Sequence, residues 1–265
     1  MLLLVGSQLI AAEQAMVSVE VVPLTHGVLA NEIIEVAVIF SMEPGWYTYW
    51  QNPGEAGMPT SFEWSLPRDF KVINRREPVP TRHIDQGITT FILDNEALYL
   101  FSIQAPAEIP DSNVFALDIQ WLECKDLCQP GSSKHRFMIP TSNTPSKAIK
   151  ERTALLKQAE KRFPDSGPIS LGTVSKKENQ IELAFRHLPW DRKLLSVDFF
   201  PYDEMVYDLA RPVHVKRGFG KQWIIIPLLN NADVLPESLH GVLVQTFASP
   251  GGPITTHSIV NQPFQ

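Results

Sequence analysis

Short runs in which apolar and polar side chains alternate constrain the fold of this sequence more than any other feature. The clearest runs lie at residues 17–21, 33–40 and 115–121. A period of two is typical of β-strands, in which successive side chains point to opposite faces of the sheet. The sequence also contains 22 prolines, a residue excluded from helix interiors and from central strands. Both features predict many short strands joined by turns.

Turns are expected where Pro, Gly and Asn cluster, at "EPGW" (43–46), "NPGEAGMP" (52–59) and "QPGSS" (129–133). Strand patterns resume in the second half of the sequence, about one every ten to fifteen residues. These runs are "IELAF" (181–185), "LLSVDFF" (194–200), "QWIIIPL" (222–228), "GVLVQTFA" (241–248) and "THSIV" (256–260).

One segment, "TPSKAIKERTALLKQAEKRF" at 144–163, has the pattern of an amphipathic helix. Thr144 is a suitable N-cap and Pro145 suits the first helical position. Its apolar stripe consists of Ile149, Leu156, Ala159 and Phe163. The sequence therefore predicts an all-β protein of two β-sandwich domains, at 16–142 and 166–265, joined by a helical connector at 143–165.

Residues 1–15 begin with an apolar run and end in small residues. They resemble the second half of a secretory signal without its positive first part, and so indicate a truncated signal segment with cleavage after Ala12. A buried or frayed first strand is the alternative. No later run reaches the roughly 18 apolar residues of a membrane helix, so we expect an exported chain that does not span the membrane.

The net charge of −6 and the lack of a basic stripe argue against nucleic acid as a partner. In an exported protein, disulfide bonds persist. The sequence has two cysteines, Cys124 and Cys128, and three interpretations of them stay open: a structural disulfide, half of a metal site, or a pair that exchanges electrons.

Geometry limits these interpretations. If the strand that ends at Cys124 continued, Cys128 would lie about 13 Å away, so a disulfide requires residues 125–127 to turn. Pro130 and Gly131 suggest that the chain then leaves the sheet, near the surface. A bond that closes so small a loop stabilises the fold by only about 2 kcal/mol, which weakens the structural interpretation.

A metal site is less well supported by the sequence. Cys-x3-Cys is not a common zinc spacing. A Cu(I) site would need the two thiolates and further ligands, for which His135 and Met138 are the nearest candidates. We expect neither a cofactor nor a metal.

Four longer segments of the sequence resemble a known protein family. They are "GWYTYWQNPGEAGMPTSFEW" with "PVPTRHIDQGITTF" and "ALYLFSI", followed by "WLECKDLCQPG". Together they resemble the periplasmic N-terminal domain of the DsbD family of thiol:disulfide interchange proteins, and more closely its ScsB-like branch, which is linked to suppression of copper sensitivity. The similarity covers residues 30–140 well and the second half more loosely.

The resemblance implies an immunoglobulin-like fold, a periplasmic location and a redox function. Cys124 and Cys128 would be the redox pair, with Cys128 the sulfur expected to form mixed disulfides. They would relay electrons from a membrane-embedded thiol reductase to periplasmic thioredoxin-like proteins. Both partners are expected to be separate proteins, because the sequence contains neither a membrane domain nor a thioredoxin-like domain.

The resemblance also implies supporting residues. Residues 82–89 fall where the family has a cap loop over the cysteines, but His83 and Asp85 stand here in place of an aromatic cap. Tyr47 and Tyr49 fall on the neighbouring aromatic segment. Two other functions stay open: a non-enzymatic binding or assembly module whose disulfide is structural, and a Cu(I)-binding protein.

Overall fold

The computed structural model describes residues 15–110, 112–142, 156–157, 159–165, 171–177, 179–185, 193–218, 222–230 and 236–264. Within these ranges the chain forms seventeen strands. Ten belong to the first half of the chain: β1 (Val17–Pro23), β2 (Ile33–Met42), β3 (Tyr47–Gly54), β4 (Ser61–Ser65), β5 (Lys71–Arg76), β6 (Thr81–Asp85), β7 (Ile88–Asp94), β8 (Glu96–Gln104), β9 (Val114–Cys124) and β10 (Cys128–Met138). Seven follow: β11 (Leu171–Lys177), β12 (Gln180–Phe185), β13 (Leu194–Pro201), β14 (His214–Arg217), β15 (Gln222–Pro227), β16 (Ser238–Phe247) and β17 (Ile254–Pro263).

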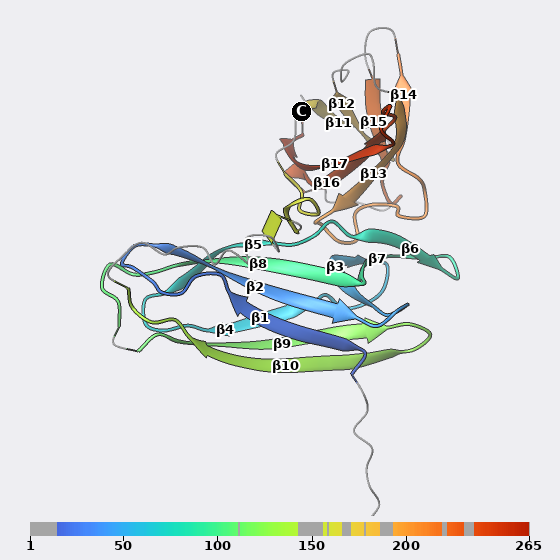
Figure 1. Cartoon of the computed structure of the whole chain (residues 1–265). Coiled ribbons are helices and arrows are strands. Elements are labelled where there is room, and N and C mark those ends of the chain that lie inside the picture. The colour runs from blue at the N-terminus through green and yellow to red at the C-terminus, as the bar shows by residue number, and fades with distance from the viewer. Residues whose placement is uncertain are drawn as a thin grey trace, which may run out of the picture.

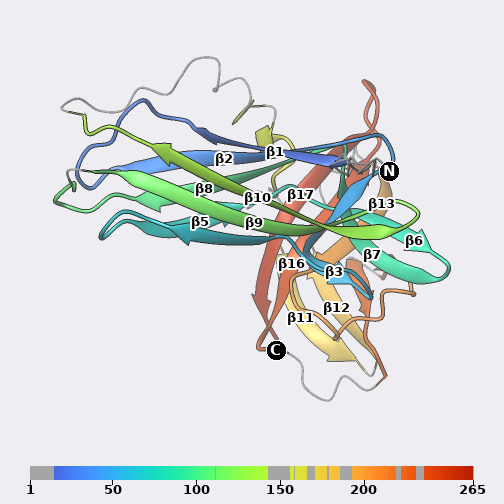
Figure 2. The same cartoon turned by 90° about the horizontal axis from the view of Figure 1, so that it is seen from below.

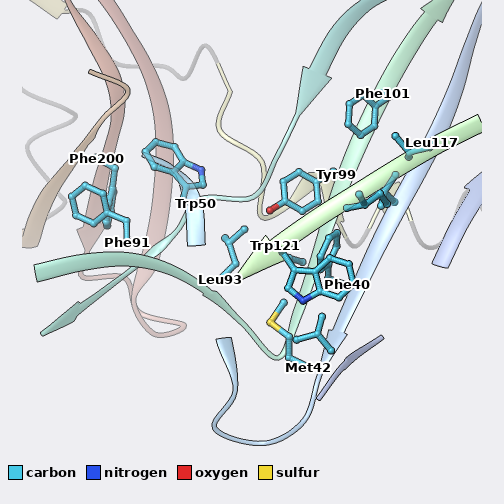
Figure 3. Close-up of a cluster of buried hydrophobic side chains, with 14 of the residues drawn as sticks. Phe40, Met42, Trp50, Phe91, Leu93, Tyr99, Phe101, Leu117, Trp121 and Phe200 are labelled. Atoms are coloured by element: carbon cyan, nitrogen blue, oxygen red, sulfur yellow. The ribbon is translucent and has the colours of Figure 1, made fainter. Parts of the chain in front are cut away.

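Strands β1–β10 form two antiparallel sheets, which we call the first sandwich. One sheet has the order β1-β2-β8-β5, and the other has the order β10-β9-β3-β7-β6 with β4 also paired to β9. Figure 1 shows the long strands of both sheets stacked in two layers. Phe40 of β2 and Tyr99 of β8 meet Trp121 of β9 in the space between the sheets, where the Phe40 and Trp121 ring centroids lie 5.4 Å apart (Figure 3).

Strands β11–β17 form the second sandwich, with one sheet in the order β11-β12-β15-β14 and another in the order β13-β16-β17. Buried side chains from both sheets, such as Leu183, Ile224 and Leu243, fill its interior. The strands pack across one face of the first sandwich (Figures 1 and 2). The expected all-β architecture of two sandwiches is therefore confirmed.

The two sandwiches share part of one hydrophobic core. Phe200 of β13 and Val242 of β16 are buried with Trp50 and Phe91 of the first sandwich. The Phe91 and Phe200 ring centroids are 5.1 Å apart (Figure 3). The Trp50 ring also stacks on that of Tyr202, with centroids 5.2 Å apart. Because these rings exclude water from both sides, the second sandwich is held against the first by burial of apolar surface.

The expected helix is not confirmed. Residues 143–155 and residue 158 of the connector lie outside the described residues, as do residues 1–14 of the expected signal segment. The four described residues at 156–157 and 159–160 are helical, and Ala159 and Phe163 are buried against the outer face of β2 and β8. The division at 16–142, 143–165 and 166–265 stays a prediction.

The turn expected at "QPGSS" is wrong, because residues 129–133 lie inside β10. Pro130 is tolerated there since β10 is the edge strand of its sheet. Gly131 lies under the Trp121 ring, where a Cβ atom would come within 2.2 Å of the ring. This glycine is therefore explained by close packing and not by a turn.

Candidate functional site

The two cysteines close the hairpin formed by β9 and β10. Cys124 is the last residue of β9, Cys128 is the first of β10, and the two are register partners with Cα atoms 4.1 Å apart. Their sulfurs form a disulfide bond of 2.03 Å. Residues 125–127 turn between them, as the geometric argument required. The expectation that the chain leaves the sheet after Cys128 is wrong, since β10 continues along β9 to Met138.

The two sulfurs lie in different environments. Cys124 is fully buried, whereas Cys128 is exposed at the start of an edge strand. Leu127, beside it in the turn, is 83% exposed. Thiol–disulfide exchange requires that an attacking thiolate reach one sulfur, and of these two residues only Cys128 is exposed.

Tyr49 of β3 covers the buried sulfur. Its hydroxyl lies 3.3 Å from Cys124 Sγ and 3.9 Å from Cys128 Sγ. Burial raises the pKa of Tyr49 to about 12, with further contributions from neighbouring Tyr47. Tyr49 is therefore a neutral phenol at physiological pH and can donate a hydrogen bond to sulfur.

Tyr47 and His83 extend this contact away from the disulfide. Tyr47 is the register partner of Cys124, and its ring centroid lies 5.7 Å from that of Tyr49. The His83 ring lies 5.2 Å from the Tyr47 ring on the other side. A row of three rings thus leads from the sulfurs to β6.

The segment expected as a cap loop is a β-hairpin. β6 pairs with β7 from Thr81 to Asp85, and the hairpin turns at Gln86 and Gly87. Both turn residues have positive φ, of 48° and 85°, which is the conformation of a tight two-residue hairpin. Asp85 is exposed beside this turn, and within the described part of the chain no hydrogen bond or ion pair joins it to either cysteine.

Glu123 is a residue of the site that the sequence analysis missed. Its side chain is buried and accepts hydrogen bonds from Trp121 Nε1 at 2.9 Å, Gln129 Nε2 at 2.7 Å and the Met16 amide at 3.3 Å. These bonds join β9, the start of β10 and the residue that precedes β1. The alternation of β9 could have indicated this role, because Glu123 is the next inward-facing position after Ile119 and Trp121.

The second sandwich holds the β6–β7 hairpin in place. The Arg82 guanidinium donates two hydrogen bonds to Asp198 of β13, Nε to Oδ2 at 2.9 Å and Nη2 to Oδ1 at 2.7 Å. It also donates to the Leu209 carbonyl oxygen at 3.2 Å and lies over the Phe91 ring. Bidentate pairing of this kind fixes orientation as well as distance. The hairpin that carries His83 is therefore anchored from outside the first sandwich.

The structure of the described residues does not support a Cu(I) site in which His135 and Met138 join the two cysteines. β10 is extended, so His135 lies seven residues and about 23 Å along the strand from Cys128. Met138 is still farther along. Among the residues that the structure describes, no group of three or more His, Cys, Asp or Glu side chains could hold a metal ion.

We predict that Arg82→Ala loosens the β6–β7 hairpin. The substitution removes the paired hydrogen bonds and leaves Asp198 partly buried without its guanidinium, which should lower the free energy of unfolding by about 1–3 kcal/mol. Hydrogen exchange of the β6 and β7 amides should accelerate. Arg68→Ala is the matched control, since the Arg68 side chain is 87% exposed. Unchanged exchange in Arg82→Ala would contradict the anchoring role.

Comparisons with known proteins agree with this fold. The chain resembles "Crystal structure of the N-terminal periplasmic domain of ScsB from Proteus mirabilis", with 15% sequence identity over 96% of this chain and 97% of that one and a TM-score of 0.64. It also matches "Crystal Structure of Neisseria meningitidis DsbD n-terminal domain in the reduced form", with 15% identity over 48% of this chain and 89% of that one. The TM-score of 0.28 is too low to support a shared arrangement.

A search of curated proteins finds no match. Within the described residues, no helix has the length and apolar character needed to cross a membrane. Residues 7–139 match the family described as "Thiol:disulfide interchange protein DsbD, N-terminal". This match covers half of the chain and includes the disulfide, Tyr47, Tyr49, His83 and Asp85. The chain therefore belongs to the family of DsbD N-terminal domains.

Proposed function

We propose that this protein is a periplasmic thiol:disulfide exchange module that relays electrons through the Cys124–Cys128 pair. Family membership supports thiol–disulfide oxidoreductase chemistry in general. The observation that carries the proposal is the asymmetry of the disulfide, with Cys128 exposed and Cys124 buried under the Tyr49 hydroxyl. A bond whose role is only to close a three-residue turn adds little stability and has no need of an accessible sulfur.

The proposed reaction begins with a thiolate of a reduced donor. It attacks Cys128 Sγ, the Cys124–Cys128 bond breaks, and Cys124 leaves as a thiolate while the donor and Cys128 form a mixed disulfide. The second thiolate of the donor then attacks the donor's own sulfur and releases Cys128. The donor dithiol is oxidised to a disulfide and the Cys124–Cys128 disulfide is reduced to two thiols, a transfer of two electrons.

Delivery of the electrons follows the reverse order. Cys128 attacks the disulfide of an acceptor, and Cys124 then attacks Cys128 Sγ, which restores the internal disulfide and releases the acceptor as a dithiol. Tyr49 would donate its hydrogen bond to the Cys124 thiolate at both stages. His83 would support Tyr49 through its contact with Tyr47, and Asp85 would act through its charge on the hairpin.

The partners follow from the family. We infer that the donor is a membrane-embedded thiol reductase and that the acceptors are periplasmic thioredoxin-like proteins. A role in copper tolerance rests on the resemblance to the ScsB-like branch. The alternative is a non-enzymatic binding or assembly module in which the disulfide is structural.

The reduction potential of the pair separates these two functions. We expect a value between roughly −120 and −270 mV, the range of known exchange proteins. The measurement is equilibration of the protein in a defined thiol buffer, followed by alkylation of the free thiols. A potential below about −300 mV would indicate a structural bond that the common thiol pools leave intact, and would favour the binding module.

The two cysteine variants should behave differently. Cys124→Ser leaves the exposed Cys128 thiol free, so it should form a mixed disulfide with an oxidised thioredoxin-like partner, and only the partner's own second thiol can reverse it. Cys128→Ser leaves only the buried Cys124 and should form little or none. Non-reducing gel electrophoresis of both variants with the same oxidised partner compares them directly. Equal yields would show that burial of Cys124 does not direct the attack.

Tyr49→Phe should make the reduction potential more negative by about 10–30 mV. A thiolate accepts a hydrogen bond more strongly than a disulfide sulfur does, so loss of the hydroxyl destabilises the reduced form more than the oxidised form. The same thiol titration measures the change. Tyr207→Phe is the control, because it removes a buried hydroxyl from the interior of the second sandwich. An unchanged potential in Tyr49→Phe would remove Tyr49 from the mechanism.

A further inference from the structure

A second feature lies where the two sandwiches meet. A cavity of about 430 Å³ is lined by Trp50 and Gln51 of β3, by Arg75, Arg76 and Glu77 at the end of β5, and by Tyr202 after β13, among others. This volume falls within the range of small-molecule sites, which are frequent at interfaces between domains. The cavity is separate from the disulfide, because Tyr49 contacts the sulfurs while Trp50 packs against Tyr202.

One wall of the cavity is aromatic and carries a buried donor. The Trp50 and Tyr202 rings stack at 5.2 Å. Trp50 is 1% exposed, and no described residue accepts a hydrogen bond from its Nε1. Figure 3 shows this nitrogen on the side of the ring that faces away from Phe91 and Phe200. Because this nitrogen is enclosed by protein, the wall offers a ligand the Tyr202 ring and not this donor.

The cavity is also lined by a guanidinium with spare hydrogen-bonding capacity. Arg75 Nη2 lies 3.4 Å from Gln51 Oε1 and 3.8 Å from Glu77 Oε1. Both distances exceed the 2.7–2.9 Å of charge-assisted hydrogen bonds, and a guanidinium has five N–H donors. Arg76 lines the same cavity and lies over the Phe163 ring at 4.5 Å. The cavity therefore offers positive charge to an acceptor.

Glu77 is the acidic group of this cavity. It is 8% exposed, and within the described residues its Oε1 has no hydrogen-bond donor. Burial raises the pKa of Glu77 to about 7, although the charge of Arg75 acts to lower it. The Tyr99 and Tyr202 side chains face its charge as well, and Asp165 lines the cavity. A protonated Glu77 is a hydrogen-bond donor and adds no negative charge.

We propose that this cavity binds a small organic carboxylate. The ligand carboxylate would accept hydrogen bonds from Arg75, and the carbon skeleton would lie against the Tyr202 ring. This site is independent of the exchange reaction, so the binding experiment is performed with the Cys124–Cys128 disulfide intact. Failure of either proposal then leaves the other unaffected.

The test is isothermal titration of the full chain with acetate, succinate, glutamate and citrate at constant ionic strength. At least one should bind saturably with one site per chain in the millimolar range or below. Arg75→Ala should weaken that binding about tenfold or more, the effect of losing a charge-assisted hydrogen bond. Arg68→Ala, which makes the same change of charge at an exposed position, should bind like the wild type. Absence of saturable binding for all four probes would overturn the proposal.

Two further variants guard against misfolding of Arg75→Ala. Arg75→Lys keeps the positive charge and should bind more tightly than Arg75→Ala, whereas an equal loss of affinity in both variants would overturn the role of this charge. Glu77→Gln keeps a neutral donor and should still bind. Equal weakening by Arg68→Ala and Arg75→Ala would show that the carboxylate responds to overall charge and not to this cavity.

The pH dependence provides an independent readout. A bound carboxylate disfavours the ionised form of Glu77, so binding takes up a proton and the affinity of the wild type should fall between about pH 6 and about pH 8. Glu77→Gln cannot titrate at this position and should lose that dependence. An identical pH profile in both proteins would contradict the electrostatic coupling between the bound carboxylate and Glu77.

Discussion

The site depends on an irregularity in β3. The ladder between β3 and β7 is regular from Tyr47 to Tyr49 and resumes at Gly54, so β3 bulges between these points. Before the bulge, Tyr47 pairs with Cys124 and Tyr49 reaches the sulfurs. Inside the bulge, Trp50 packs against the second sandwich. A bulge re-aims side chains and ends regular pairing, and here it lets one strand serve both the disulfide and the contact between sandwiches.

The strand periodicity was enough to predict eight of the seventeen strands in the described residues. The alternating runs became β1, β2 and β9, and the runs of the second half became β12, β13, β15, β16 and β17. This worked because each of these strands has a face buried in a core, and burial imposes the period of two. A disulfide between the two cysteines required a turn at residues 125–127, and this requirement followed from strand and disulfide geometry alone.

Contacts between distant parts of the sequence could not be predicted in this way. "QPGSS" has the composition of a turn, but its glycine is required by close packing under the Trp121 ring. Its proline is tolerated because β10 is an edge strand. The cap segment was placed by resemblance, whereas its anchor is Asp198, 116 residues away from Arg82. Glu123 was missed, although it joins β9 to β10 and to the residue before β1. Each of these features depends on which strands become neighbours, and a local pattern carries no information on that point.

The second sandwich is bonded to two strands that carry residues of the site, β3 and β6. The Asn52 amide at the bulge of β3 donates to the carbonyl oxygens of Pro201 and Asp203, at 2.9 and 3.2 Å. A shift of β3 by one residue would break both bonds and turn Tyr49 away from the sulfurs, because neighbouring side chains of a strand face opposite sides. Together with the bond from Arg82 to Asp198, these contacts fix β3 and β6 from the same side. The row of Tyr49, Tyr47 and His83 spans these two strands, so bonds from the second sandwich help to set its geometry although, among the described residues, none of them reaches the cysteines.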